Sequence, residues 1–287
     1  MKHTTLEIFR NSVIVFLTVS CFAFGSTTHA ADDVAKTKTL LLIGGPADGH
    51  KPATHEYMAG VRIVAKLVAN VPGLKTRVVS AGEIWKEGPK ALAEVDGAVV
   101  FLSEGARWTR TDLRRYDALA QLAKRGGGLS VLHWGMGTRE AKNIAGFQKL
   151  FGGCHGGPDR KYKHLKTTLS VADAKHPITR GLQKTLKVDE EFYYRLKFIK
   201  DAGTVHPLMS ADIEGNDETV CWAWERPDGG RSFGFSGLHY HRNWREETYR
   251  RLVAQGVLWT MKLPIPKSGM NVALDNAAFG LPASKKK

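Results

Sequence analysis

The segment Gly126–Thr138, GGGLSVLHWGMGT, indicates the fold class more clearly than any other part of the chain. The apolar run LSVLHW predicts a buried strand, and the glycines that precede it suit the end of a helix. The spacing that follows resembles the nucleophile elbow G-x-[Ser/Cys]-x-G, a sharp strand-to-helix turn above a sheet. Here His133 stands in the place of the nucleophile, and Val131 replaces the first glycine. We therefore expect a tight turn that presents the His133 imidazole to a cleft rather than to the core.

Strands and helices alternate on the N-terminal side of this segment. The patterns predict a strand at 38–45, a helix at 55–70, strands at 74–82 and 95–105, and a helix that opens at Thr109–Asp112 with a pattern like a capping box. The strands are apolar throughout rather than alternating, which is typical of a parallel sheet covered on both faces. The sequence therefore predicts an α/β fold with a mostly parallel sheet and helices on both faces.

The C-terminal half is richer in strands. Strand patterns occur at 166–173, 204–212, 219–225 and 232–239, a turn at RPDGG (226–230), and a closing helix at 245–261. We expect extra strands in this half and a Lys-rich, flexible tail at 267–287.

Residues 1–30 have the pattern of a secretory signal: a basic start, an apolar run and Thr28-His29-Ala30 before a cleavage site. The prediction is an exported protein, periplasmic or extracellular, without stable membrane insertion; an uncleaved N-terminal anchor stays an alternative. Cys154 and Cys221 then remain, either bridged or as two buried thiols. The net charge of +14 is spread along the chain without any nucleic-acid-binding motif, so we expect no nucleic-acid partner. The sequence leaves the oligomeric state open.

Histidines gather where the predicted strands end. In parallel sheets ligands bind outside the carboxyl ends of the strands, which places the loops at 44–55, 103–108 and 133–139 on one rim. Aromatic side chains near this rim could pack on the apolar faces of a sugar. The candidate substrate-binding residues are His50, His55, Trp134, Tyr193, His241 and Trp244.

The segment VDEEFYYRLKF (188–198) supplies acids beside aromatic residues. Because a strand alternates its faces, consecutive acids cannot all point the same way. We expect Glu190 to face the cleft, where burial would raise its pKa for acid/base work. The predicted catalytic residues are His133, Glu190 and His239.

Four motifs in order resemble the ThuA-like, or trehalose-utilisation, family. They are LLIGGPADGHKPATHEYMAGVRIVAKLV, LSVLHWGMG, HPITRGL with VDEEFYYRLKF, and GRSFGFSGLHYHRNW with YRRLVAQGVLWT, and the likeness runs from about Thr39 to about Pro266. The resemblance implies one ThuA-like domain at 31–266 with a flavodoxin-like fold related to class I glutamine amidotransferases. It also implies a carbohydrate partner and a link to 3-keto sugars. His133 in place of cysteine excludes glutamine hydrolysis.

Two functions follow. The first is a lyase, hydrolase or isomerase that acts on a glycoside or 3-keto-sugar by acid/base chemistry, without a certain cofactor. A divalent metal such as zinc could assist, held by His133, His155 and His239, with Glu190 a further candidate ligand. The second is a non-catalytic carbohydrate-binding or scaffold protein on the same fold. A third, weaker alternative is polyanion binding through the basic surface.

Overall fold

A nine-stranded mixed sheet forms the centre of the domain. The computed structural model describes Met1 and residues 36–281, so the predicted signal at 1–30 lies outside the described residues except for Met1. The strand order is β2-β1-β3-β4-β12-β11-β10-β7-β8. Neighbouring strands are parallel from β2 to β12 and antiparallel from β12 to β8. The predicted α/β class is confirmed, but the sheet is mixed because the C-terminal strands extend it in antiparallel fashion.

The strand bounds agree with most of the predicted strands. The large sheet contains β1 (Lys38–Gly44), β2 (Leu74–Ser80), β3 (Gly97–Phe101), β4 (Gly128–Leu132), β7 (Lys161–Val171), β8 (Thr185–Tyr194), β10 (Thr204–Ile213), β11 (Asn216–Glu225) and β12 (Arg231–Phe235). A small separate sheet contains β5 (Gly137–Thr138), β6 (Gly153–Gly156) and β9 (Lys197–Phe198).

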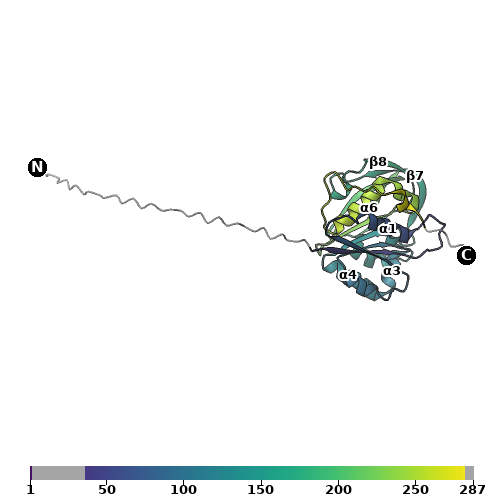
Figure 1. Cartoon of the computed structure of the whole chain (residues 1–287), viewed down its shortest axis with the longest axis horizontal. Coiled ribbons are helices and arrows are strands. Elements are labelled where there is room, and N and C mark those ends of the chain that lie inside the picture. Colours follow the sequence, from purple (N-terminus) through teal and green to yellow (C-terminus); the bar gives the residue numbers. More distant parts are fainter. Residues whose placement is uncertain (2–35, 282–287) are drawn as a thin grey trace. The chain divides into compact units, whose positions relative to one another are not determined.

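Helices cover both faces of the parallel half of the sheet. Figure 1 shows α1 (Tyr57–Leu67) and α6 (Glu247–Thr260) on one face, and α3 (Gly105–Thr111) and α4 (Leu113–Lys124) on the other. The alternation of β1 explains this arrangement, because Leu40 and Leu42 pack in the cluster that contains α1 and α6, whereas Leu41 packs in the opposite cluster. The remaining helices are α2 (Gly88–Ala93), α5 (Ile144–Phe151) and the 3₁₀ segments η1 (His133–Met136), η2 (Ala141–Asn143), η3 (Pro177–Thr179), η4 (His241–Arg245) and η5 (Asn276–Phe279).

The helix predicted to open at Thr109–Asp112 is two helices. Asp112 has an extended backbone and ends α3, and its side chain accepts a hydrogen bond from the Arg114 N–H at 3.0 Å, which caps α4. Thr109 lies inside α3, where its hydroxyl donates to the Gly105 carbonyl. A helix N-cap is therefore present in the predicted segment, but the capping residue is Asp112 and the capped helix is α4.

The C-terminal segment packs against the domain as far as residue 281. Met270, Val272 and Phe279 are buried, and Arg250 and Arg251 donate hydrogen bonds to the backbone carbonyls of Val272 and Met270. The structure thus differs from the predicted flexible tail over residues 267–281, because buried apolar side chains hold this part in place. The terminal lysines lie outside the described residues.

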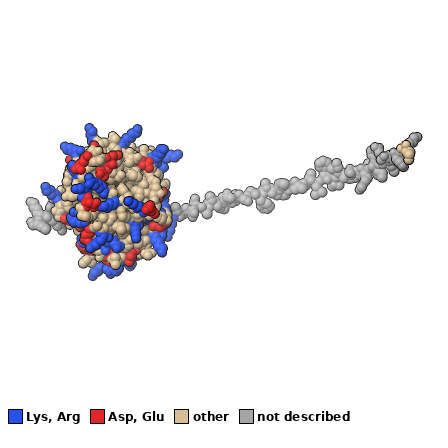
Figure 2. Space-filling view, turned by 180° about the vertical axis from the view of Figure 1, so that it is seen from behind, with Lys and Arg blue, Asp and Glu red and all other residues tan. Residues whose placement is uncertain are grey.

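The surface charge, the cysteines and the helices can be compared with the expectations from composition. Lys, Arg, Asp and Glu are interspersed over the face shown in Figure 2, where no stripe of one sign runs across the surface. Cys154 and Cys221 are both free and buried, which settles the alternatives in favour of two thiols. Among the described residues, no helix combines the length and the apolar character that a membrane span requires.

Candidate functional site

His133 occupies a strained turn directly after β4. Its φ is +48°, in the left-handed region that non-glycine residues rarely adopt, and the 3₁₀ segment η1 begins there. A Cβ at Gly135 would lie 2.7 Å from the Val100 carbonyl oxygen, so glycine is required for the close approach. The sharp turn is present as predicted. The imidazole is fully buried, however, so it lies beneath the cleft rather than open to it.

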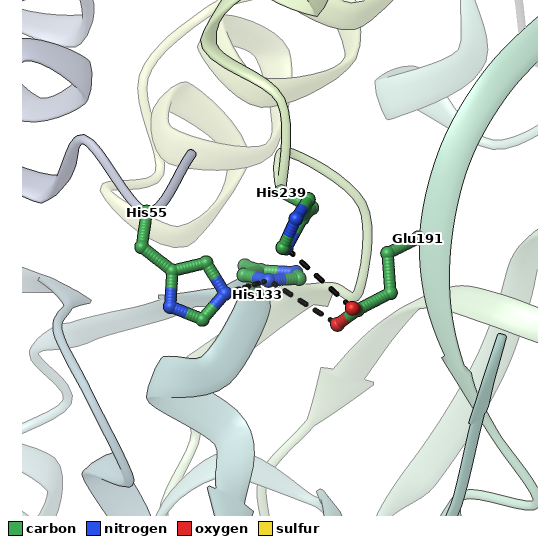
Figure 3. Close-up of side chains that lie close together, drawn as sticks. All are labelled: His55, His133, Glu191 and His239. Atoms are coloured by element: carbon green, nitrogen blue, oxygen red, sulfur yellow. Dashed lines mark hydrogen bonds and ion pairs between the residues drawn. The ribbon is translucent and has the colours of Figure 1, made fainter. Parts of the chain in front are cut away.

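Four side chains converge at this point, as Figure 3 shows. His55 precedes α1, His133 follows β4, His239 follows β12, and Glu191 lies on β8. One nitrogen or oxygen atom of each lies within 4.8 Å of the corresponding atoms of the others, and all four residues are buried. The carboxyl ends of two parallel strands and the end of the antiparallel extension therefore meet at one site.

The two imidazoles of His55 and His133 face each other through their Nε2 atoms, which are 3.0 Å apart. The Nδ1 of His133 donates to the Ser236 carbonyl at 2.8 Å, and the Nδ1 of His55 donates to the Asp48 carboxylate at 2.8 Å. Burial lowers the pKa of both imidazoles and so favours their neutral form, and the acceptors at Nδ1 favour the tautomer that carries its proton there. Two Nε2 lone pairs consequently point at each other, an arrangement that a cation between them would stabilise.

Asp48 is the ionised partner that fixes the His55 ring. Burial alone would raise the pKa of Asp48, but hydrogen bonds from His55, Tyr57 and His50 hold it well below its usual range. A carboxylate that orients a ligating histidine is common in metal sites, because it fixes the tautomer and leaves Nε2 free.

His239 and Glu191 complete the cluster. The Nδ1 of His239 is buried, has no hydrogen-bond partner within residues 36–281, and lies 3.6 Å from Glu191 Oε2. Burial, with His55 and His164 nearby, lowers the pKa of His239 to about 3. Burial raises the pKa of Glu191 to about 7, and its Oε2 lies 2.6 Å from the Nε2 of His164. An unpartnered buried nitrogen and a carboxyl that titrates near neutrality are both typical of functional sites.

Backbone strain is concentrated beside the three histidines. His55 has a φ of +53° and His133 of +48°, and Leu238, directly before His239, has a φ of +81°. Such conformations are costly for non-glycine residues and persist where the surrounding structure enforces them, often at functional sites. The same residues are therefore singled out by strain and by convergence.

Glu190 does not face the cleft, contrary to the prediction. Its carboxylate is completely buried and accepts hydrogen bonds from the backbone N–H groups of Leu238 (2.8 Å), His239 (3.1 Å) and Glu191 (2.9 Å). The Asn243 amide donates to it at 2.9 Å as well. Glu190 thus holds the loop that carries His239, and Glu191 takes the place at the cleft that was predicted for Glu190.

Three residues of the cluster, His55, Glu191 and His239, line a cleft of about 620 Å³, and the buried His133 lies beneath it. Four of the six predicted substrate-binding residues line it, namely His50, His55, Trp134 and Tyr193, and so does His239. Of the three predicted rim loops, the one at 103–108 lies instead at a smaller neighbouring cavity. The cleft is lined by His50, Lys51, Thr54, His55, Trp134, Arg139, Arg160, Tyr162, His164, Glu191, Tyr193, His239 and Tyr240.

Besides His133 and Glu190, three predicted site residues do not line the cleft. Trp244 belongs to the hydrophobic core, and the Nε2 of His241 pairs with the Phe279 carbonyl at 3.1 Å. His155 is fully buried, stacks on Tyr193 with ring centroids 4.5 Å apart, and lies outside the four-residue cluster. His155 is therefore replaced by His55 in the set of candidate metal ligands.

Several residues of the site could not be predicted from the sequence. His164 faces Glu191 across the β7–β8 pairing, and this register cannot be derived from one sequence. Tyr162 and Tyr240 at the cleft were not predicted either. For Glu191, the alternation rule required that one of the adjacent acids face the cleft but did not say which one.

The geometry suits a zinc site with one open position. Catalytic zinc sites use three protein ligands, often histidines, and leave a place for water or substrate. The Nε2 atoms of His55 and His133 and the Nδ1 of His239 offer such a set, and Glu191 lies beside it. This donor set, drawn from three distant loops, also explains why no local zinc motif is present in the sequence.

Comparisons with known proteins agree with this fold. The family model ThuA, described as trehalose utilisation, matches residues 48–260. A ThuA-like protein from Bacteroides uniformis is 15% identical, with a TM-score of 0.61 over 79% of this chain and 92% of that chain. A ThuA-like protein from Parabacteroides merdae is 14% identical, with a TM-score of 0.59 over 86% of this chain and 100% of that chain. At these identities the structural likeness shows the fold alone.

A third similar structure is a cytoplasmic protein from Salmonella typhimurium, 12% identical, with a TM-score of 0.52 over 78% of this chain and 98% of that chain. No curated protein matches the chain. The family model spans most of the domain, including all three histidines and Glu191. The predicted resemblance is confirmed, and the chain belongs to the ThuA family.

Proposed function

We propose that this protein is a metal-assisted enzyme that performs acid/base chemistry on a glycoside or a keto-sugar. The ThuA family description supports a role in carbohydrate utilisation in general. The observation that carries the finer proposal is the 3.0 Å separation of the Nε2 atoms of His55 and His133, beside the Nδ1 of His239, which has no hydrogen-bond partner among the described residues. Three buried ring nitrogens that converge in this way are suited to a divalent cation such as zinc.

Each group has a defined task in this proposal. The three histidines would hold the ion, and Asp48 and the Ser236 carbonyl fix the tautomers of His55 and His133. A bound ion would polarise a carbonyl or hydroxyl oxygen of the sugar. Glu191, whose pKa burial raises to about 7, would take up or deliver the proton at the adjacent carbon or oxygen.

The convergence of acid and imidazoles favours an enzyme over a binding module. A module that only binds sugar needs an aromatic platform, which Trp134 and Tyr193 supply at the cleft. It does not need a carboxyl 3.8 Å from the Nε2 of His133 and 2.6 Å from that of His164. The non-catalytic alternative leaves these groups without a task.

Replacing Glu191 with glutamine separates catalysis from metal binding. We expect E191Q to bind zinc within about threefold of the wild type, because the three histidines remain. Its turnover of 3-keto-glycosides or of the parent disaccharides should fall by about 10² or more, because the amide cannot exchange the proton. Zinc titration by calorimetry and a sugar-turnover assay measure the two effects, with E191D as a conservative control that retains a carboxyl. Unchanged turnover in E191Q would contradict the assigned role.

We also propose that the protein is exported, on the basis of the signal pattern in residues 1–30. The N-terminus of protein from the native host should then begin near Ala31. Edman sequencing of fractionated cells tests this, and Met1 retained on protein in the cytoplasmic fraction would count against export.

A further inference from the structure

We propose that the cleft selects sugars that carry an anionic group, a carboxylate or a phosphate, and that Lys51 and Arg160 recognise this group. The inference deepens the proposed function, on which its choice of sugars as ligands rests. It concerns cleft residues outside the four-residue cluster of His55, His133, Glu191 and His239.

The cationic side chains at the cleft outnumber the acidic ones. Lys51, Arg139 and Arg160 line it, whereas Glu191 is the only carboxyl group among the lining residues. Charges of one sign along a cleft with low-dielectric walls focus the field and concentrate ligands of the opposite sign. A divalent ion held by the cluster would add to this positive potential.

Arg139 is already balanced by an acid. Its guanidinium pairs with Glu104 at 2.7 Å, its backbone N–H donates to the same carboxylate at 2.9 Å, and its Cζ lies 5.7 Å from the centre of the Trp134 ring. Glu104 is buried and has a left-handed φ of +48°. Arg139 is therefore a fixed part of the wall, and its charge does not require an anion from the ligand.

Arg160 and Lys51 are not balanced in this way. Arg160 follows Asp159, but that carboxylate pairs with Lys197 at 2.6 Å, and the Arg160 guanidinium donates only to the Gly157 carbonyl at 3.2 Å. Within residues 36–281, neither Arg160 nor Lys51 forms an ion pair with a carboxylate. A half-buried guanidinium and an exposed ammonium in one cleft, both without a counter-ion among the described residues, suit a ligand that brings the anion.

The aromatic side chains place the rest of such a ligand. Tyr162 is 58% exposed, and its ring centroid lies 6.3 Å from that of Tyr193. Both line the cleft together with Trp134, and they offer faces for the CH groups of a sugar ring. A sugar on these rings would share the cleft with the cations and with the histidine cluster.

Calorimetry with two matched pairs of probes tests the proposal. It would compare glucuronic acid with its neutral methyl ester, and glucose 6-phosphate with glucose. A third comparison would measure the binding of glucuronic acid at low and at high salt. We expect at least one anionic probe to bind about tenfold more tightly than its neutral partner and to weaken with salt. Which of the two acids is preferred identifies the anion.

A double variant and a charge-matched control locate the effect. In K51Q/R160Q the anionic preference should fall to within about twofold, because both unbalanced cations are gone. In R62Q/K75Q, which removes two exposed cations outside the cleft, the preference should persist, which excludes an effect of net charge. Equal binding of acid and neutral partner by the wild type, or a preference that survives in K51Q/R160Q, would overturn the proposal.

The same measurements on metal-free and zinc-loaded protein keep the two proposals apart. Zinc uptake should be equal in the wild type and in K51Q/R160Q, because neither changed residue belongs to the cluster. Absent zinc uptake with a retained anionic preference would reject the metal site alone. Zinc uptake without any anionic preference would reject the present inference alone.

Discussion

Replacing His133 with alanine should abolish stoichiometric zinc binding, from about one ion per chain to nearly none. The variant removes one of three ligands and the partner of the His55 lone pair, and a two-histidine site holds zinc far more weakly. Metal analysis after dialysis measures the loss. At a free zinc concentration of about 100 times Kd, the ion should stabilise the wild type by about 2.7 kcal/mol. This corresponds to a rise in Tm of about 5–10 °C, and the rise should be absent in H133A.

His155 supplies the control for this variant. It is a fully buried histidine like His133, but it lies outside the cluster. H155A should therefore keep the zinc-dependent rise in Tm, whatever its effect on basal stability. Without metal, H133A should lose about 1–3 kcal/mol, because the buried Ser236 carbonyl loses its donor. Full zinc content in H133A would show that His133 is structural.

Substituting Glu190 with glutamine should destabilise the metal-free protein by roughly 3 kcal/mol. The Glu190 carboxylate accepts hydrogen bonds from three close backbone N–H groups and from the Asn243 amide. In the variant, the glutamine NH₂ group is itself a donor, so it cannot accept the hydrogen bonds of the N–H groups that it would meet. The loop with the strained Leu238 would then lose its anchor. The affinity for zinc should fall by about 10- to 100-fold, as is usual when a group that orients a ligand is removed.

The neighbouring variant E191Q is the matched control, since it makes the same chemical change one residue along the strand. We expect the urea midpoint of E191Q to stay close to that of the wild type and the midpoint of E190Q to fall clearly. The activities should show the opposite pattern when both are measured on folded, zinc-saturated protein: a large loss for E191Q and a smaller one for E190Q. Equal urea midpoints for E190Q and E191Q would refute the anchoring role of Glu190.

The sequence predicts the parallel half of the fold well because local patterns determine it. The buried strand and turn at Leu129–Gly135 follow from apolar runs and glycines, and this places His133 correctly at a sharp turn, although its imidazole is buried rather than open to the cleft. The position of Glu191 depends instead on how β8 pairs with β7 and which face of it meets the cleft. That choice is made by long-range packing, so one sequence could narrow it to adjacent acids but could not select between them.

The candidate metal ligands, too, could be predicted only in part from local sequence patterns. His133 and His239 stood out because they follow predicted strands, whereas His155, beside glycines, seemed equally suitable. Only the fold reveals that His55 reaches the Nε2 of His133 and that His155 stacks on Tyr193 instead. The tail differs for a related reason: its few apolar residues are buried in the hydrophobic core, and arginines of α6 bind its backbone carbonyls, which composition cannot foresee.

The mixed sheet divides the cleft between two structural units. The three histidines come from loops of the parallel half, whereas Tyr162, His164, Glu191 and Tyr193 all lie on the β7–β8 hairpin at the antiparallel end of the sheet. Insertions or exchanges in this hairpin could therefore alter the accepted sugar and the proton-transfer group while the ion stayed in place. In evolutionary terms, relatives could diversify their substrates by remodelling one hairpin, and protein engineers could graft new hairpins onto an unchanged metal-binding half.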